Sequence, residues 1–299
     1  MAFKKMERQK YPVRLWSLVG YAGSGKSTFA SQMRAPMVII DADHRFDEVL
    51  DLAQGDVYEL SDAPADHVDP SRIAALLSAN MPGSGAKTIV VDSLTTIMAP
   101  LIASAQLDFD QDKVKNLAAG WRTKALSMRL LQDAVTRWGC DVLWIWHLED
   151  ARDEKAREVV RSTLSKTERA RLVRSLNLQL EIVQEGNRRG VKVIWARRGR
   201  SGMTLWDETG TWAGMPERIE AEVYDGLTKD DQDKIETEAP EVFPDPATAI
   251  AWGLERGAFE VLQHARNAYD KIKAEKQPKT AKEMRDLWVA EVERRLAGQ

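Results

Sequence analysis

The stretch from Gly20 to Thr28 constrains the fold of this chain more than any other feature. An apolar run from Val13 to Val19 precedes it, and helix-compatible residues follow from Phe29. A glycine-rich loop between a strand and a helix is the context that phosphate binding requires. The loop comprises Gly20, Tyr21, Ala22, Gly23, Ser24, Gly25, Lys26, Ser27 and Thr28.

The residue types in this loop have physical reasons. Its glycines allow positive φ angles, so that backbone N–H groups turn inward, and the following helix adds its N-terminal dipole. Lys26 would reach the β- and γ-phosphates of ATP, Ser27 would bind Mg²⁺, and Thr28 would support the first helical turn or the nucleotide. The alternative is an ordinary glycine-rich turn at a helix start.

Two further apolar runs end on carboxylates. One precedes Asp41 and Asp43, and the other precedes Asp92. Buried strands that end on acids place them at the carboxyl edge of a parallel sheet, where α/β proteins build their sites. Asp92 is predicted to hold Mg²⁺ opposite Ser27. For Asp41, as for Asp47, a helix cap or turn is an equal alternative.

A third apolar run ends on His147, after a predicted helix from Leu117 to Trp138 with apolar residues three or four positions apart. The position of His147 favours a γ-phosphate sensor as much as a structural histidine. The tryptophans at 144, 146 and 195 favour the core over base stacking.

Length and composition narrow the class of protein. A chain of 299 residues with 43% hydrophobic content can form one large domain and a smaller one. No run approaches the roughly 18 apolar residues that span a bilayer. The N-terminus lacks an apolar signal core, so we expect a cytoplasmic protein without membrane contact. The only cysteine, Cys140, is expected in the core, and four scattered histidines leave Mg²⁺ as the expected metal.

Charge is distributed unevenly. Residues 152–200 contain fourteen basic and six acidic side chains, a net charge of +8, whereas the whole chain carries −3. This pattern indicates either a local polyanion-binding region or solvated helix charge. Within and around this segment we expect a mobile charged loop over 148–165, a helix over 166–174, and a hairpin with a basic tip of five or six residues at 185–190.

The predicted domains are an N-terminal arm (1–12), a core (13–215), an acidic linker (216–244) and a helical C-terminal domain (245–299). Asp245 and Pro246 predict a helix start, and Thr280 with Glu283 forms a capping box before the last helix. The C-terminal helices are expected to form a small domain or a partner-binding module.

The core resembles the RecA and RadA recombinase ATPases, especially the phage Sak-type single-strand annealing ATPases, over residues 13–206. The resemblance is carried by the Gly20–Thr28 loop, the stretch from Asp41 to Asp47, the Ile89–Ser93 strand end, the 117–147 helix and strand, and the strand at 191–193. It implies an α/β fold: a RecA-like P-loop NTPase core with a mostly parallel central sheet and a β-hairpin, plus a small C-terminal helical domain.

The resemblance also implies roles for single residues. Asp43 stands where RecA has the glutamate that orients the attacking water, and His147 stands where RecA has the glutamine that senses the γ-phosphate. Arg197, with Arg198 or Arg200, falls where the family places arginines that reach the neighbouring subunit's nucleotide. The N-terminal polymerisation elements of RecA have no counterpart, which favours a ring or short filament.

We therefore expect a homo-oligomeric ATPase with ATP at its subunit interfaces that binds single-stranded DNA in recombination or annealing. The C-terminal helices would recruit a replication or recombination protein. Alternatives are a P-loop kinase for a small metabolite and a non-hydrolysing, ATP-controlled assembly switch or loader. The predicted DNA-contacting residues are Arg152, Lys155, Arg157, Arg161, Lys166, Arg188 and Arg189.

Overall fold

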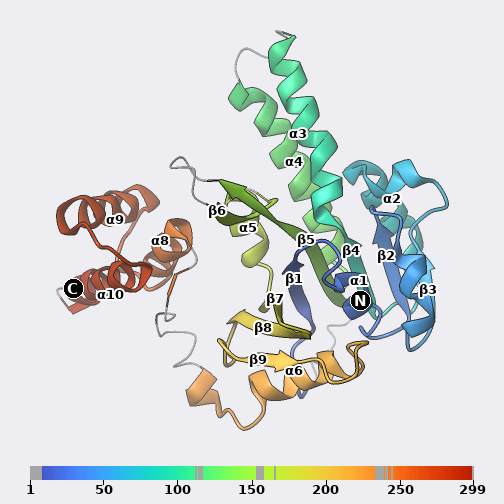
Figure 1. Cartoon of the computed structure of the whole chain (residues 1–299). Coiled ribbons are helices and arrows are strands. Elements are labelled where there is room, and N and C mark those ends of the chain that lie inside the picture. The colour runs from blue at the N-terminus through green and yellow to red at the C-terminus, as the bar shows by residue number, and fades with distance from the viewer. Residues whose placement is uncertain are drawn as a thin grey trace, which may run out of the picture. The chain divides into compact units, whose positions relative to one another are not determined.

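The computed structural model describes residues 9–111, 113, 117–152, 158–164, 166–232, 239, 242–243 and 245–297. Eight strands form one sheet in the order β3-β2-β4-β5-β1-β7-β8-β9, and β6 pairs with the outer part of β5 (Figure 1). The strands are β1 (Leu15–Gly20), β2 (Met37–Asp41), β3 (Val57–Glu59), β4 (Thr88–Asp92), β5 (Asp141–Arg152), β6 (Glu158–Ser162), β7 (Leu178–Glu185), β8 (Arg188–Ala196) and β9 (Thr204–Trp206).

The sheet is parallel from β3 to β7 and antiparallel from β7 to β9. Strand β5 lies between β1 and β4, so the strand ends carrying Gly20, Asp92 and His147 are neighbours at one edge. This is the edge where parallel α/β sheets place their sites.

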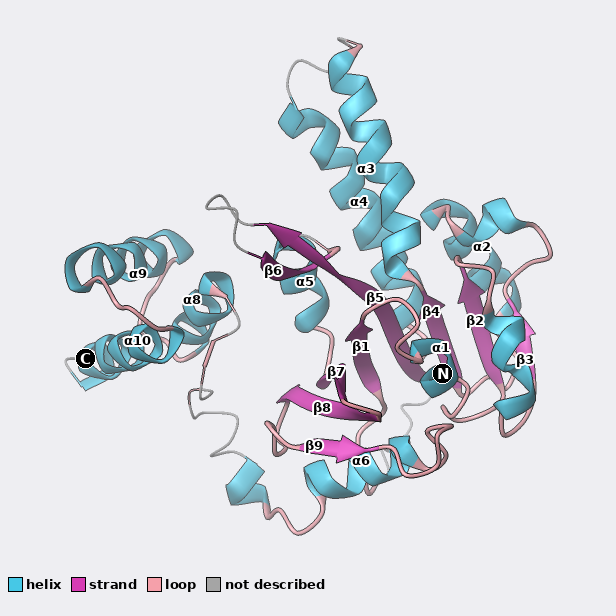
Figure 2. Cartoon of the chain, in the orientation of Figure 1, coloured by secondary structure: helices cyan, strands magenta, loops and turns pink. Residues whose placement is uncertain are grey.

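Alternating side chains build a core on each face of the sheet. Trp16 and Leu18 of β1 pack on one face with Phe29, and Trp144 of β5 packs on the other with Leu131. Helices cover both faces, as Figure 2 shows by colour. They are α1 (Lys26–Ala30), α2 (Pro70–Asn80), α3 (Leu94–Asp110), α4 (Leu117–Thr136), α5 (Lys166–Val173) and α6 (Met215–Tyr224), with 3-10 helices η1 (Phe46–Leu52) and η2 (Pro64–His67).

The tryptophans of β5 and β8 lie in the core, as predicted. Trp144 and Trp146 are buried, and Trp195 packs partly buried against the same cluster. Strand burial rather than base stacking therefore accounts for them.

The structure corrects two sequence predictions within the basic segment. The charged stretch predicted as a mobile loop over 148–165 instead continues β5 to Arg152 and returns as β6, with Leu148 opposite Ser162. The sequence of this ribbon is rich in charged residues and has no hydrophobic alternation, so the pattern did not predict strands there. The second hairpin turns at Gly186 and Asn187 alone, because β8 already begins at Arg188. Its tip is therefore shorter than predicted.

The predicted domain boundary also differs. The first compact unit extends to Gly226, so α6 belongs to the core rather than to the acidic linker. Met215, Ile219 and Val223 recur every four residues and are buried against the sheet. Near the N-terminus, the Tyr11 hydroxyl donates to Asp225 at 2.8 Å, so the described end of the predicted arm packs on this unit.

The second unit, Leu227–Gln299, contains α8 (Pro246–Glu255), α9 (Leu262–Lys276) and α10 (Ala281–Ala297). Asp245 caps α8 by accepting from the Thr248 N–H at 2.8 Å, as predicted. The apolar face of α10 packs inside this unit, where Trp288 stacks on Phe259 at 5.4 Å. The predicted fold class, with a mostly parallel sheet, a β-hairpin and a helical C-terminal part, is confirmed. Within the described ranges, no helix has the length and apolar character that crossing a bilayer requires.

Candidate active site

The phosphate-binding loop joins β1 to α1. Gly23 and Gly25 adopt left-handed backbone angles, with φ of 73° and 91°, which only glycine takes without strain. Lys26 is buried, and its ammonium donates to the carbonyl oxygens of Gly20 at 3.1 Å and Tyr21 at 2.7 Å. Burial lowers the pKa of Lys26. Its charge is therefore held at the loop by backbone oxygens that a phosphate group would replace.

Ser27 and Asp92 lie together, as the sequence predicted for metal ligands. The Ser27 hydroxyl donates to Asp92 Oδ2 at 2.6 Å, and the Asp92 side chain is almost fully buried. Burial raises the pKa of Asp92 to about 6, helped by the charges of Asp43 and Asp41 and opposed by the Ser27 hydrogen bond. A divalent cation would relieve this desolvation, so these two oxygen donors fit Mg²⁺.

Asp43 receives three hydrogen bonds. Oδ1 accepts from the hydroxyls of Ser93 at 3.1 Å and Thr96, and Oδ2 contacts His147 Nε2 at 3.2 Å. Burial opposes ionisation, but the bonds from His147, Thr96 and Ser93 outweigh it and lower the pKa of Asp43 to about 2. The carboxylate is therefore ionised and fixed in direction. The sequence analysis missed Ser93 and Thr96, although two hydroxyl residues close behind Asp92 were a visible signal.

The two other acids near Asp43 do not join this cluster. Asp41 accepts from the Phe46 N–H at 2.8 Å, the turn role that was its alternative interpretation. Asp47 is exposed on η1. Only Asp43 of the three carboxylates bonds to His147.

His147 is bonded at its backbone as well as its ring. Its N–H donates to the Thr95 hydroxyl at 3.0 Å, and its carbonyl accepts from the Thr163 hydroxyl at 3.0 Å. The two threonine hydroxyls bond each other at 2.7 Å. Because Thr163 directly follows β6, this network links the site to the β5–β6 hairpin.

The predicted basic residues have different surroundings. The Arg197 guanidinium donates to the Arg174 carbonyl at 3.2 Å and is exposed, away from its own phosphate loop. Arg188 lies over the Trp206 ring at 4.7 Å. Lys155 and Arg157 fall outside the described residues, as do the side chains of Arg152, Arg161 and Lys166.

Arg189, a predicted DNA contact, is partly exposed and bonded within its own unit. Its Nε donates to Asp207 at 2.9 Å, and its guanidinium lies over the Trp212 ring at 4.7 Å. Trp212 in turn donates from Nε1 to the Gly25 carbonyl at 3.0 Å. Sequence reasoning missed this cluster because its members are far apart in the chain.

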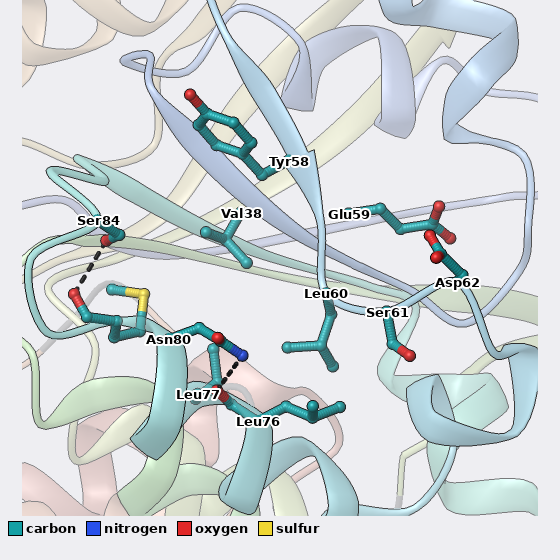
Figure 3. A pocket seen from close by; sticks show the side chains of 11 residues that line it. Val38, Tyr58, Glu59, Leu60, Ser61, Asp62, Leu76, Leu77, Asn80 and Ser84 are labelled. Carbon is teal, nitrogen blue, oxygen red and sulfur yellow. Dashed lines mark hydrogen bonds between the residues drawn. The ribbon is translucent and has the colours of Figure 1, made fainter.

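A pocket of about 570 Å³ lies between α2 and β3, the outermost strand on one side of the sheet (Figure 3). It contains none of the predicted site residues. Its lining is mostly apolar with a polar rim: Val38, Tyr58, Glu59, Leu60, Ser61, Asp62, Leu76, Leu77, Asn80, Met81 and Ser84.

Comparison with known proteins identifies a family that matches the core of this chain. A family model described as an AAA domain matches residues 14–212. The crystal structure of a RadB recombinase is similar with 17% identity and a TM-score of 0.39, over 66% of this chain and 87% of that chain. A KaiC-like protein from the hyperthermophilic archaeon Pyrococcus horikoshii is similar with 14% identity and a TM-score of 0.39, over 66% and 84%. No curated protein matches.

The matched region spans well over half of the chain and includes the phosphate loop, Asp43, Asp92 and His147. The chain therefore belongs to this AAA domain family.

Proposed function

We propose that this P-loop ATPase binds single-stranded DNA in an ATP-dependent manner and promotes annealing or recombination, like the phage Sak-type ATPases that its sequence resembles. The observation that carries the proposal is the hydrogen-bonded path from Asp43 through His147 to Thr163. The path joins the nucleotide side of the sheet to the β5–β6 hairpin, whose sequence over residues 148–162 contains four basic and five acidic residues.

The path supports coupling between nucleotide and DNA. A γ-phosphate beside Asp43 would offer the His147 ring a competing acceptor. A shift that extends to the His147 backbone would act on Thr163, whose hydroxyl and N–H both donate to the His147 carbonyl. The hairpin sequence contains Arg152, Lys155, Arg157 and Arg161, whose positive charges would contact a phosphate backbone. The five acids of residues 148–162 outnumber them, so DNA binding depends on which of these side chains face the strand.

The chain's own residues divide the work of hydrolysis. Lys26 supplies positive charge at the loop, Ser27 and Asp92 hold the metal, and ionised Asp43 orients a water molecule by accepting its proton in a hydrogen bond. Mg²⁺, when bound, would neutralise negative charge on the phosphates.

The proposal includes an oligomer with ATP between subunits. Arg197 is exposed and follows Ala196, which pairs with Leu178 in register with Trp16, so it lies at the opposite edge of the sheet from its own phosphate loop. Any contact of Arg197 with ATP would therefore be with the nucleotide of a neighbouring subunit. The helical unit from Leu227 would then recruit a replication or recombination protein.

Steady-state phosphate release from ATP, with and without single-stranded DNA, tests the proposal. We expect DNA to stimulate release, and we expect Lys26→Ala to abolish both basal and stimulated activity because the loop loses its cation. DNA binding should weaken steeply with salt, since basic side chains displace counterions.

Unchanged phosphate release in the presence of DNA, together with no DNA binding at low salt, would sink the recombination proposal. If DNA has no effect but Lys26→Ala abolishes phosphate release, the protein is an ATPase whose hairpin binds a partner other than DNA.

A non-hydrolysing assembly switch is the second candidate, and the hydrogen bonding of Asp43 favours it. Both carboxylate oxygens are already occupied by Ser93, Thr96 and His147, and aspartate is one methylene shorter than the glutamate of RecA. Light scattering distinguishes the candidates: a switch changes its oligomer size with ATP but releases no phosphate. The pocket in Figure 3 lacks residues of the phosphate loop, so it gives a kinase no acceptor site beside ATP.

A further inference from the structure

The turn after β9 is built around one carboxylate. Asp207 Oδ1 accepts from the backbone N–H groups of Thr209 at 3.1 Å, Gly210 at 3.1 Å and Trp212 at 3.3 Å. The Asp207 side chain is only 1% exposed. A buried carboxylate with three backbone donors fixes the path of the turn.

The same carboxylate holds Arg189 of β8. Its Oδ2 accepts from Arg189 Nε at 2.9 Å, and Arg189 Nη2 donates to the Gly210 carbonyl. The guanidinium plane then lies over the Trp212 ring, 4.7 Å from its centroid. A planar group bonded at two corners and packed on one face has little freedom to turn.

Trp212 connects Arg189 and Asp207 to the phosphate loop. The indole is fully buried, donates to the Gly25 carbonyl at 3.0 Å and packs edge-on against Phe29 of α1, with the centroids 5.9 Å apart. Gly25 is the left-handed residue directly before Lys26. The indole N–H therefore bonds the peptide that sets where the lysine begins.

The third nitrogen of Arg189 also reaches the loop. A Cβ atom at Gly25 would stand 2.6 Å from Arg189 Nη1 and 3.1 Å from Trp212 Nε1. Gly25 thus needs to be glycine for a second reason besides its φ angle. The guanidinium brings a positive charge against the loop that would hold phosphates.

We propose that Arg189 and Trp212 are positioning residues of the phosphate loop, which hold Gly25 in the conformation that binds a nucleoside triphosphate. The inference rests on the proposed ATP binding and assigns that binding a support from the β8–β9 region. Arg189 and Trp212 act on the loop rather than on the attacking water, so their removal raises the Kd and KM for ATP and leaves kcat largely unchanged.

Calorimetric titration with ATP and Mg²⁺ tests this in Arg189→Ala and in a matched control, Arg218→Ala. Arg218 donates to the Trp206 carbonyl at 3.2 Å and pairs with Glu208 at 3.6 Å, so it supports the same region without an assigned contact to the loop. We expect about tenfold weaker binding for Arg189→Ala, the value of one charged hydrogen-bond contact, and wild-type binding for Arg218→Ala.

Thermal melting without nucleotide separates positioning from unfolding. If the melting temperature of Arg189→Ala is well below that of Arg218→Ala, the titration is repeated with Arg189→Lys in place of Arg189→Ala. Lysine keeps the charge and the packing on Trp212 but cannot bridge Asp207 and Gly210. A folded Arg189 variant that binds ATP like the wild type would overturn the inference. Equal weakening in Arg218→Ala would overturn it too, since any damage to the region would then suffice.

Failure of the proposed function has a different signature. If the wild-type protein and Lys26→Ala give the same absence of heat with ATP, ATP binding itself is wrong and the inference falls with it. If the wild-type protein binds ATP and Lys26→Ala does not, the proposed ATP binding is supported. The comparison of the Arg189 and Arg218 variants then tests only the positioning role of Arg189 and Trp212.

Discussion

Asp43 and Asp92 show how two carboxylates at one sheet edge acquire opposite properties. Asp43 has three hydrogen-bond donors and a pKa of about 2, whereas Asp92 is buried with one hydroxyl donor and has a pKa of about 6. The donors stabilise the charge of Asp43, and desolvation destabilises the charge of Asp92. Asp43 is thus suited to orient a water molecule, and Asp92 to receive a cation.

The raised pKa of Asp92 predicts that Asp92→Asn stabilises the metal-free protein at neutral and higher pH. The folded state binds this proton more tightly than the unfolded state, so the ionised carboxylate destabilises the fold increasingly as pH rises from about 4 to about 6. We expect a gain of about 1–3 kcal/mol at about pH 8 and almost none at about pH 4.

Urea unfolding with a chelator at both pH values measures this gain. Phosphate release should be lost in the same variant, because Ser27 alone remains as a metal ligand. Lower stability of Asp92→Asn at about pH 8 would contradict the assigned cost of burial.

Asp43→Asn is predicted to separate binding from hydrolysis. An amide cannot accept a proton from water as a carboxylate does, so we expect phosphate release to fall about 10²–10³-fold while ATP affinity is kept. Asp47→Asn is the control, since Asp47 is exposed on η1 and should leave both unchanged. Equal rates of phosphate release in Asp43→Asn and Asp47→Asn would show that Asp43 has no part in hydrolysis, and would favour the non-hydrolysing assembly switch.

At the scale of elements, α6 is attached to the sheet by a buried ion cluster. Arg14, fully buried before β1, donates to Glu220 at 2.6 Å and to Glu217 at 2.8 Å. Arg34 binds Glu220 from the partly exposed side at 2.9 Å. The cluster explains why an acidic stretch that resembled a linker is part of the core.

The cluster predicts unequal effects for its two arginines. Arg14→Ala leaves Glu220 and the N-terminal end of the sheet without their buried cation, and we expect a loss of about 3–5 kcal/mol. Arg34→Ala removes a partly exposed cation that also pairs with Asp141 at 3.3 Å, but Glu220 keeps Arg14, so we expect a smaller loss of about 1–2 kcal/mol. The free energy of unfolding from urea titration compares them, and equal losses would show that burial does not control the cluster.

The hydroxyl link at the hairpin base predicts a variant that uncouples DNA from ATP. Thr163→Val keeps the size of the side chain and removes the hydroxyl bonds to His147 and Thr95, while the residue's N–H still donates to the His147 carbonyl. We expect basal phosphate release to stay and stimulation by DNA to fall severalfold, at a stability cost of about 1 kcal/mol. Full stimulation in Thr163→Val would exclude the hydroxyl link as the coupling route.

For the whole molecule, the two compact units divide after Gly226, and every predicted catalytic and nucleotide-binding residue lies in the first. A chain of residues 1–226 is therefore expected to fold and to bind ATP with unchanged affinity, because the described members of its two cores all lie at or before Tyr224. Calorimetric titration checks the affinity, and circular dichroism checks the fold. A loss of ATP binding in a folded 1–226 chain would assign the helical unit a part in the site.

The sequence by itself determined the phosphate loop, the meeting of Ser27 with Asp92 and the parallel strands of the sheet. These features depend on local patterns: glycine spacing around Lys26, apolar runs that end on Asp43, Asp92 and His147, and caps such as Asp245. Parallel strands bring their carboxyl ends to one edge, so local order was enough to predict that these residues meet.

Only the tertiary structure decided which polar groups act on those residues. Arg189 was predicted to face DNA, yet Asp207 and Trp212 hold it against Gly25, and the pairing of β5 with β6 replaced a predicted loop. Such contacts join residues between about ten and nearly two hundred positions apart, and neither charge nor hydrophobic period specifies a partner at that range. Burial then sets the energies: the same residue type has a pKa of about 2 at Asp43 and about 6 at Asp92 because packing, not sequence, determines what surrounds each carboxylate.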